Sequence, residues 1–477
     1  MVSRGSKLVK NSLIFAIGTF APKVLSFLLV PLYTSTMSTA DFGAADLLFS
    51  TAALVYPVCT LQINVATMRY SFNRDDKLPL AVGYRYTVSG CFGAGLLLLV
   101  ISLAFPEVLS TRNAFYLFTL ISVNAMYALA VSYLRGTEQV GLIASVGALS
   151  SVLTVSLSYL FLAVFNAGID GYITAQILAL GLAFAVAFFM GDMKCNVFCV
   201  FGGSAVAQLA KDMCSFAIPL IFSGVAWWFN SSSSRYILAI MCGTSVSGIF
   251  AVAYKIPNIL GSLQSVFSQA WLLSALEEDG KEGSEEYFHR SYMMYLTALV
   301  ATTGLIYIFN IPLASMLFAN DFFDAWRYVP MLTCCALITA LNSFLESIFN
   351  ARRETGVIAK TAIVGAMITV LLSMPLIGML GAYGCGLATL VGYGAVLEMR
   401  MAHYRTTSDI SLGGARSTIT VLILSSASLL LPFGGRPAYF AILLTFLSVF
   451  LLRKEVGSAG RAVCGIVRKK LFGRVLR

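Results

Sequence analysis

Long apolar runs separated by short polar segments recur along the chain, from near its N-terminus almost to its C-terminus. Runs of about 18 to 25 residues have the length of an α-helix that crosses a hydrocarbon core of roughly 30 Å. The pattern therefore predicts an all-α polytopic membrane protein with about 14 transmembrane helices. The expected helices cover residues 11–33, 42–66, 83–105, 113–134, 141–165, 169–190, 214–233, 245–272, 291–312, 328–350, 357–380, 382–402, 417–433 and 437–452.

A polar segment at residues 192–212 is the longest interruption of hydrophobicity before the middle of the chain. A shift of 205 residues places Phe42-Gly43 of the first half on Ser247-Gly248 of the second. This weak repeat predicts two six-helix lobes related by a pseudo-twofold axis. The expected parts are an N-lobe at residues 1–200, a C-lobe at 201–410, two more helices at 411–452, and a basic amphipathic cytoplasmic tail at 453–477.

Composition and charge agree with a membrane protein, since 58% of the residues are hydrophobic and only 11% are charged. The net charge of +10 invites a nucleic-acid interpretation, but most Lys and Arg residues fall in the loops that one topology assigns to the cytoplasm. This distribution obeys the positive-inside rule. It predicts cytoplasmic termini, and it explains the positive net charge without binding to nucleic acid. The first helix lacks a small-residue cleavage site, so we expect it to be an anchor and not a signal peptide.

Two lysines fall inside predicted spans. At a rise of roughly 1.5 Å per residue, Lys23 lies about 18 Å into the first helix and Lys255 about 15 Å into the eighth. An ammonium near the bilayer midplane costs on the order of 3 kcal/mol on insertion scales. Pro22 and Pro257 loosen the backbone beside these cations. We expect both lysines to face a shared anion-binding cavity; structural pairing of each with an acid on a neighbouring helix is the alternative.

Two residues of the seventh helix are further candidates for substrate binding. Arg235 follows Ser231 to Ser234, and we predict that these residues form a short polar link at the outer end of the helix. The arginine is expected either to contact the substrate or to be interfacial. Trp228, near the middle of the helix, suits either the protein core or a surface on which sugar rings stack.

Three charged residues are candidates for coupling or gating. Asp46 lies near the outer end of the second helix, Arg69 at its inner end, and Glu346 near the inner end of the tenth. Each also suits a plain interfacial position. Glu346 is expected to form a salt bridge with Arg352 or Arg353.

No metal, cofactor or catalytic centre is expected. Among ten cysteines, Cys195 and Cys199 are the one pair with suggestive spacing, and no His or further Cys accompanies them. A glycan polymerase or glycosyltransferase needs acid, base or metal-binding residues on sizeable polar loops. Here the outer loops are short, and the two histidines, His289 and His403, are predicted on the inner side. We therefore do not expect an enzyme.

The residues and their order resemble a known family. The opening stretch NSLIFAIGTFAPKVLSFLLVPLYTSTMSTADFGAADLL resembles the first two helices of the bacterial polysaccharide-biosynthesis flippases, the O-antigen or Wzx-type branch of the superfamily that also holds the multidrug exporters. The segments Phe216–Leu220, Ser234–Tyr236 and Gly248–Lys255 are similar to the family's most recognisable part. Many relatives carry an acid immediately before the arginine that matches Arg235, and this chain has Ser234 there.

The resemblance implies a flippase of the bacterial plasma (inner) membrane. Its substrate would be an undecaprenyl-pyrophosphate-linked oligosaccharide, moved to the outer leaflet by alternating access for cell-surface polysaccharides such as the O-antigen of lipopolysaccharide. The implied partners are membrane lipids and other polysaccharide-assembly membrane proteins. A peptidoglycan lipid-precursor flippase and a cation-coupled multidrug exporter of the same fold are the alternatives. The exporter predicts carboxylates at the midplane, where this sequence has lysines.

Overall fold

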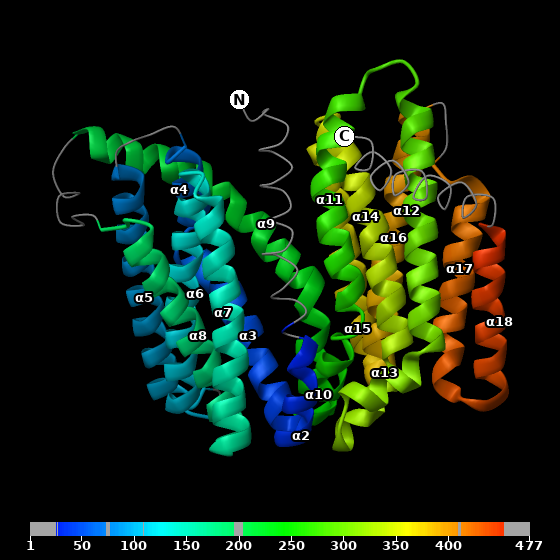
Figure 1. Ribbon diagram of the computed structural model, residues 1–477, viewed down its shortest axis with the longest axis horizontal. Coiled ribbons are helices and arrows are strands. Elements are labelled where there is room, and N and C mark those ends of the chain that lie inside the picture. The colour runs from blue at the N-terminus through cyan, green and yellow to red at the C-terminus, as the bar shows by residue number, and fades with distance from the viewer. Residues whose placement is uncertain are drawn as a thin grey trace, which may run out of the picture. The chain divides into compact units, whose positions relative to one another are not determined.

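The computed structural model describes residues 25, 27–72, 77–107, 109–194, 204–408 and 412–452 of the chain. Secondary structure within these residues is helical and contains no strand (Figure 1), so the predicted all-α class is confirmed. Lys23, the Cys195 and Cys199 pair, and the tail at 453–477 lie outside the described residues. By internal contacts the chain divides into two compact units, Met1–Gly248 and Ile249–Arg477. The domain limits that follow the predicted repeat stay a prediction.

The first unit is a bundle in which α6 packs against α3, α4, α5 and α8, and α7 packs against α8. One core cluster joins Leu80 of α5 to Leu129 of α6 and Ala183 of α8. A second joins Ile63 of α4 and Val82 of α5 to the first half of α9, through Met213. Its elements are α2 (Val30–Thr36), α3 (Thr39–Cys59), α4 (Ile63–Tyr70), α5 (Leu78–Ala104), α6 (Thr111–Gly136), α7 (Val140–Tyr159), the π-helical η1 (Leu160–Val164), α8 (Gly168–Met190), α9 (Ser204–Cys242) and the start of α10 (Thr244–Ala253).

The second unit is built around α14, of which 78% of the most apolar stretch is buried. This helix contacts α11, α12, α16 and α17, and α18 packs on α12 and α17. Its elements after α10 are α11 (Asn258–Glu278), α12 (Ser284–Ile308), α13 (Asn310–Leu317), the 3-10 helix η3 (Asn320–Arg327), α14 (Val329–Ala351), α15 (Thr355–Leu380), α16 (Ala382–Thr407), α17 (Gly414–Leu430), η4 (Leu431–Phe433) and α18 (Gly435–Leu451).

The helices predicted at 357–380 and 382–402 correspond to α15 and α16, which form a hairpin around Gly381 in the second unit. Helix α15 ends at Leu380 and α16 begins at Ala382, so one residue reverses the chain. Gly381 has φ +58° and ψ −134°, a conformation that is essentially restricted to glycine. The two helices then run side by side.

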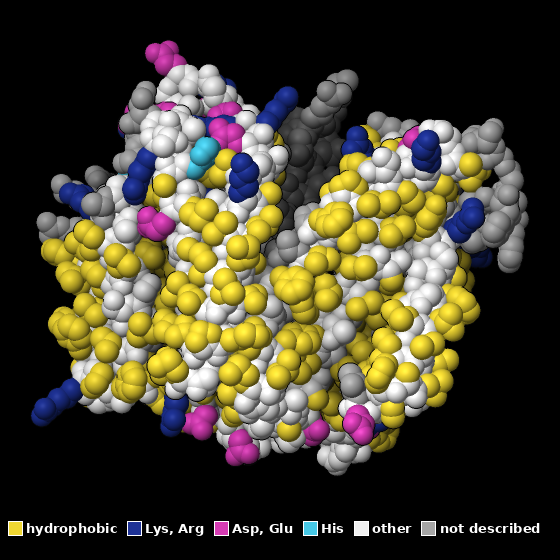
Figure 2. Space-filling view, turned by 180° about the vertical axis from the view of Figure 1, so that it is seen from behind, with side chains coloured by type: hydrophobic (Ala, Val, Ile, Leu, Met, Phe, Trp, Pro, Cys, Tyr) yellow, Lys and Arg dark blue, Asp and Glu magenta, His cyan; other side chains and the backbone are white. Residues whose placement is uncertain are grey.

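The helices have the surface of a membrane-spanning protein. Within the described residues, nine are long and apolar enough to cross a membrane, and the bent pair α10 and α11 makes up to ten. Figure 2 shows hydrophobic side chains over the middle of both units and charged side chains toward the helix ends. Exposed apolar side chains include Phe92 at 72% and Leu371 at 70%. The protein therefore crosses the membrane several times, whereas the predicted number of helices is not confirmed.

The predicted polar link before Arg235 is wrong, because α9 continues without interruption from Ser204 to Cys242. The hydroxyls of Ser231 and Ser233 donate to the carbonyls of Trp228 and Phe229, one turn earlier in the same helix. Such bonds satisfy serine within a helix, so a serine run need not end one. Arg235 consequently lies inside α9.

The span predicted at residues 42–66 is broken into α3 and α4. Pro57 lies in the last turn of α3 and supplies no backbone N–H, and its carbonyl accepts from the N–H of Gln62, 2.9 Å away. Leu61 and Gln62 follow with φ values of +55° and +53°. These left-handed residues end one helix and start the next.

Candidate functional site

Asp46 of α3 and Arg235 of α9 form an ion pair within the first unit. The guanidinium Nη1 lies 2.7 Å from the carboxylate Oδ2, and the two side chains are 24% and 17% exposed, respectively. The Nη2 of Arg235 donates to Ser232 Oγ at 3.1 Å. Half-buried charges are screened less by salt than surface pairs are. The carboxylate partner of Arg235 thus comes from another helix, 189 residues earlier in the chain.

Aromatic side chains of α9 extend this polar contact along α3. Trp228 donates its indole N–H to the Ser50 carbonyl at 2.7 Å. The Tyr236 hydroxyl donates to the Leu47 carbonyl at 2.9 Å and lies 2.6 Å from Thr51 Oγ1. Because α3 offers backbone carbonyls to α9 in this way, the register between the two helices is determined by hydrogen bonds as well as by packing.

Trp228 is a packing residue in this structure. Its side chain is 8% exposed, and its ring centroid lies 5.2 Å from that of Tyr236. The buried ring packs α3 against α9, as expected if Trp228 belongs to the protein core. Sugar stacking on Trp228 stays a prediction.

Lys255 lies at the break between α10 and α11. The two helices are bent by 48° relative to each other, and α11 begins at Asn258, directly after Pro257. The proline lacks a backbone N–H and its ring disfavours a continuous helix. Lys255 is half-buried and belongs to the segment between the two helices, where the helix geometry is interrupted. Irregular backbone at membrane depth is tolerated where it is buried in protein or lines a cavity.

Arg69, in the last turn of α4, has a separate environment. Its guanidinium carbon lies 4.4 Å from the ring centroid of Phe216 in α9, within the range of a cation–π contact. The arginine is exposed. It therefore stands on the surface of the first unit, well removed along the α3–α4 span from Asp46.

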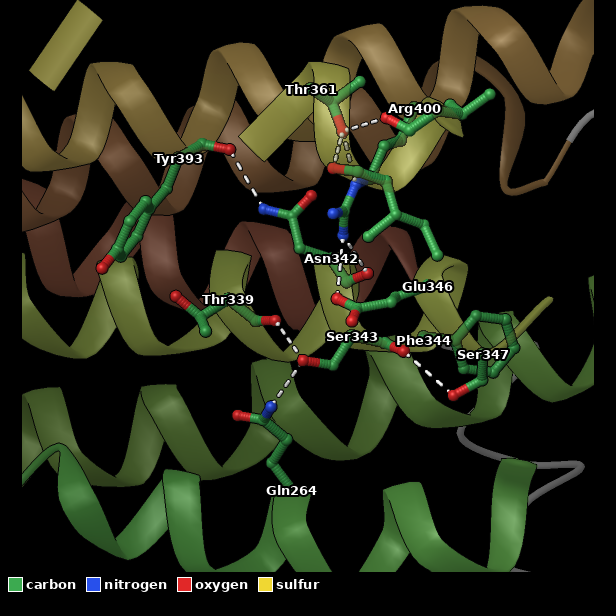
Figure 3. Close-up of polar contacts among 12 residues, drawn as sticks. Gln264, Thr339, Asn342, Ser343, Phe344, Glu346, Ser347, Thr361, Tyr393 and Arg400 are labelled. Atoms are coloured by element: carbon green, nitrogen blue, oxygen red, sulfur yellow. Dashed lines mark hydrogen bonds and ion pairs between the residues drawn. The ribbon is translucent and has the colours of Figure 1, made fainter. Parts of the chain in front are cut away.

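Glu346 pairs with Arg400 in the second unit (Figure 3). The Arg400 Nη1 lies 3.5 Å from Glu346 Oε2 and donates to the Asn342 carbonyl at 2.8 Å, while Nε donates to Thr361 Oγ1 at 3.1 Å. Arg400 is 3% exposed, whereas the Glu346 side chain is 45% exposed. One buried guanidinium thus joins α14, α15 and α16.

The predicted bridge from Glu346 to Arg352 or Arg353 is wrong. Arg352 instead lies 3.5 Å from Asp279 and donates to Ser408 at 3.0 Å. Its guanidinium carbon is 5.0 Å from the Tyr404 ring centroid. The helix rotation that brings Glu346 toward α16 leaves Arg352 facing the end of α11.

The comparisons with known proteins identify the family. Residues 8–272, more than half of the chain, match the family described as polysaccharide biosynthesis protein. The chain belongs to that family. No curated protein sequence matches it.

Solved transporters share the fold of this polysaccharide biosynthesis protein. The lipid II flippase MurJ in an inward closed conformation matches with a TM-score of 0.63 at 13% identity, covering 96% of this chain and 100% of that one. An inward-facing MATE family multidrug transporter of the MOP superfamily matches with a TM-score of 0.64 at 13% identity, covering 82% and 99%. An outward-facing one has a TM-score of 0.56 at 14% identity, covering 84% and 95%.

The structure brings together two of the predicted site residues, Asp46 and Arg235, which the sequence had assigned to different roles. Arg69 and Glu346 each have other partners, and Lys23 lies outside the described residues. Within the described ranges, no three His, Cys, Asp or Glu side chains are arranged to hold a metal ion.

Sequence reasoning missed the burial of Arg400. A signal was present, because Arg400 shares the spacing of a buried helical stripe with Leu397, Met401 and Tyr404, each of them 5% exposed or less.

Proposed function

We propose that this family member is a flippase that moves undecaprenyl-pyrophosphate-linked oligosaccharide across the bacterial plasma membrane by alternating access. Its termini would lie in the cytoplasm, and it would act beside other polysaccharide-assembly proteins. The glycan headgroup cannot cross hydrocarbon unaided, because each unpaired polar group there costs several kcal/mol. A cavity with fixed cations replaces the lost hydration of the pyrophosphate, while the polyprenyl tail stays in lipid.

The ion pair between Asp46 and Arg235 is the observation that carries this proposal. The half-buried carboxylate lies 2.7 Å from the guanidinium, so the pair has no net charge. A cationic drug or a coupling cation needs an acid with negative charge to spare, which Asp46 does not offer in this arrangement. The paired acid supports an anionic substrate over a cationic one.

The internal repeat supports a shared role for the two lysines. At the offset of 205 residues, Lys23 matches Trp228 and Lys255 matches Ser50. Trp228 and Ser50 are hydrogen-bonded to each other. If a pseudo-twofold axis exchanges the two halves, the pair of Lys23 and Lys255 corresponds to the hydrogen-bonded pair of Trp228 and Ser50. We propose that the two lysines bind the pyrophosphate together. The Asp46 and Arg235 pair would act as a gate.

The test of function is the lipid-linked glycan pool of cells that lack this protein. We expect undecaprenyl-linked repeat units to accumulate on the inner leaflet, where a membrane-impermeant oxidant applied to spheroplasts does not reach them, and the wild-type gene to clear them. Accumulation of the peptidoglycan precursor instead would favour the alternative flippase. Absence of any lipid-linked glycan would overturn the proposal and favour the drug exporter.

Lys255→Ala is expected to lower the rate at which the pool is cleared by roughly 10- to 100-fold, the equivalent of one hydrogen bond to a charged group. Lys23→Ala should act alike, and Lys255→Arg should retain most of the rate because it keeps the charge. Lys360→Ala, at an exposed position of α15, is the matched control. If Lys255→Ala clears the pool as fast as this control does, the lysine site is refuted while flipping stands.

A further inference from the structure

The outer end of α3 and the start of α10 meet backbone to backbone within the first unit. A Cβ added to Gly43 would overlap the carbonyl oxygen of Thr244, and a Cβ added to Gly248 would overlap that of Thr39. Both glycines are buried. Small residues of this kind allow membrane helices to approach closely, and here nothing larger than a hydrogen fits.

This contact is reciprocal in the register of the internal repeat. The offset of 205 residues relates Thr39 to Thr244 and Gly43 to Gly248. A Cβ at either glycine would lie 2.9 Å from the backbone nitrogen of the other, and 3.0 Å from the carbonyl carbon of the opposite threonine. Equal and exchanged contacts are what a twofold axis requires. The two segments, both within the first unit, therefore contact each other with local twofold symmetry.

A side-chain hydrogen bond crosses the contact, and one side of the contact is exposed. Thr39 Oγ1 is hydrogen-bonded to Ser245 Oγ across the two helices. Ser245 is exposed, whereas Ser247 is fully buried and lies 3.4 Å from the Arg235 carbonyl. The contact thus covers the region just outside the Asp46 and Arg235 pair, which begins one turn further along α3.

We propose that Gly43 and Gly248 form a twofold seal that closes the outer end of the transport route, and that the two helix ends separate when the route opens. This inference rests on the proposed function, because opening refers to the proposed transport route. The contact between the two glycines does not depend on the substrate. Because the seal is symmetric, the two glycines are equivalent, and a methyl group at either one displaces a rigid backbone carbonyl. Overpacking of this kind shifts the equilibrium toward the separated state.

The test uses Ser247→Cys, a buried position within the seal, as a reporter. Its reaction with a membrane-impermeant maleimide is measured on spheroplasts and inverted vesicles, with the chain lacking the reporter as background. We expect slow labelling from the outer side, and labelling about tenfold faster when either Gly43→Ala or Gly248→Ala is added. Gly261→Ala and Gly93→Ala, where an added Cβ meets nothing within 4 Å, are matched controls and should change nothing.

A second variant leaves both glycines intact and so avoids a folding defect at the contact. Thr39→Cys with Ser245→Cys should cross-link with a mild oxidant, because the two side chains already touch. The disulfide should abolish clearance of the glycan pool, and reductant should restore it. Unchanged labelling in both alanine variants, or full transport by the cross-linked protein, would overturn the seal. Failure of the glycan pool to accumulate without the protein would refute the proposed function alone, since the labelling result does not depend on it.

Discussion

Replacing Arg235 with Gln is expected to lower the stability of the protein by on the order of 2 kcal/mol, and Asp46→Asn by a similar amount. Each change leaves the other charge half-buried without its 2.7 Å partner. The double variant, Asp46→Asn with Arg235→Gln, should be more stable than either single variant, because no unpaired charge remains. Melting temperatures of the purified wild type, the two single variants and the double variant in detergent measure this order of stability.

Arg112 and Asp170 provide the matched control for this prediction. They also form an ion pair between two helices of the first unit, but their side chains are 57% and 46% exposed. Arg112→Gln should therefore cost less than about 1 kcal/mol. A double variant that loses as much stability as the sum of the singles would contradict the coupling, and would indicate that the two residues act independently.

The same variants distinguish a structural role from gating. Asp46→Asn removes the carboxylate that lies 2.7 Å from Arg235, so an anionic substrate no longer competes with that carboxylate. We expect the apparent affinity for lipid-linked glycan to rise while turnover falls. A purely structural pair would lower the amount of folded protein and leave both parameters of the folded fraction unchanged.

Arg400→Ala is expected to cost on the order of 3 kcal/mol, the largest loss of stability among the changes considered. The change removes donors to Thr361, Asn342 and Glu346, and it opens a cavity where three helices meet, since Arg400 is 3% exposed. Arg400→Lys should recover little, because one ammonium cannot serve the Nε and Nη1 acceptors together.

Two comparisons make this second prediction specific. Arg400→Met keeps the length of the side chain and should lose less stability than Arg400→Ala. Arg405→Ala, an exposed position in the last turn of the same helix, should stay within about 0.5 kcal/mol of wild type. Equal melting temperatures for Arg400→Ala and Arg405→Ala would show that the buried guanidinium does not hold α14, α15 and α16 together.

Local features of the sequence predicted the helical elements well. The apolar runs at 169–190 and 328–350 correspond closely to α8 and α14, and Gly381 marked the turn between α15 and α16. The length of a hydrophobic run and the conformational range of glycine are properties of the local chain. The helix spans and the glycine turn therefore appear in the structure as predicted, because neither depends on contacts with distant parts of the chain.

The internal repeat was predicted from the sequence only in part. The offset of 205 residues came from a short match around Gly43 and Gly248, and the structure shows those glycines in reciprocal contact. Sequence similarity indicated that the two segments are equivalent. It did not indicate that they touch, because equivalence holds at any distance from an axis.

The sequence by itself determined the membrane class, most helices and the unusual cations. Only the tertiary structure decided that Asp46 neutralises Arg235, that serines extend α9 instead of ending it, and that Glu346 pairs with Arg400 and not with Arg352. The physical reason is that hydrophobic length depends on neighbouring residues alone. The partner of a charge depends on which helices are adjacent and how each is rotated about its axis.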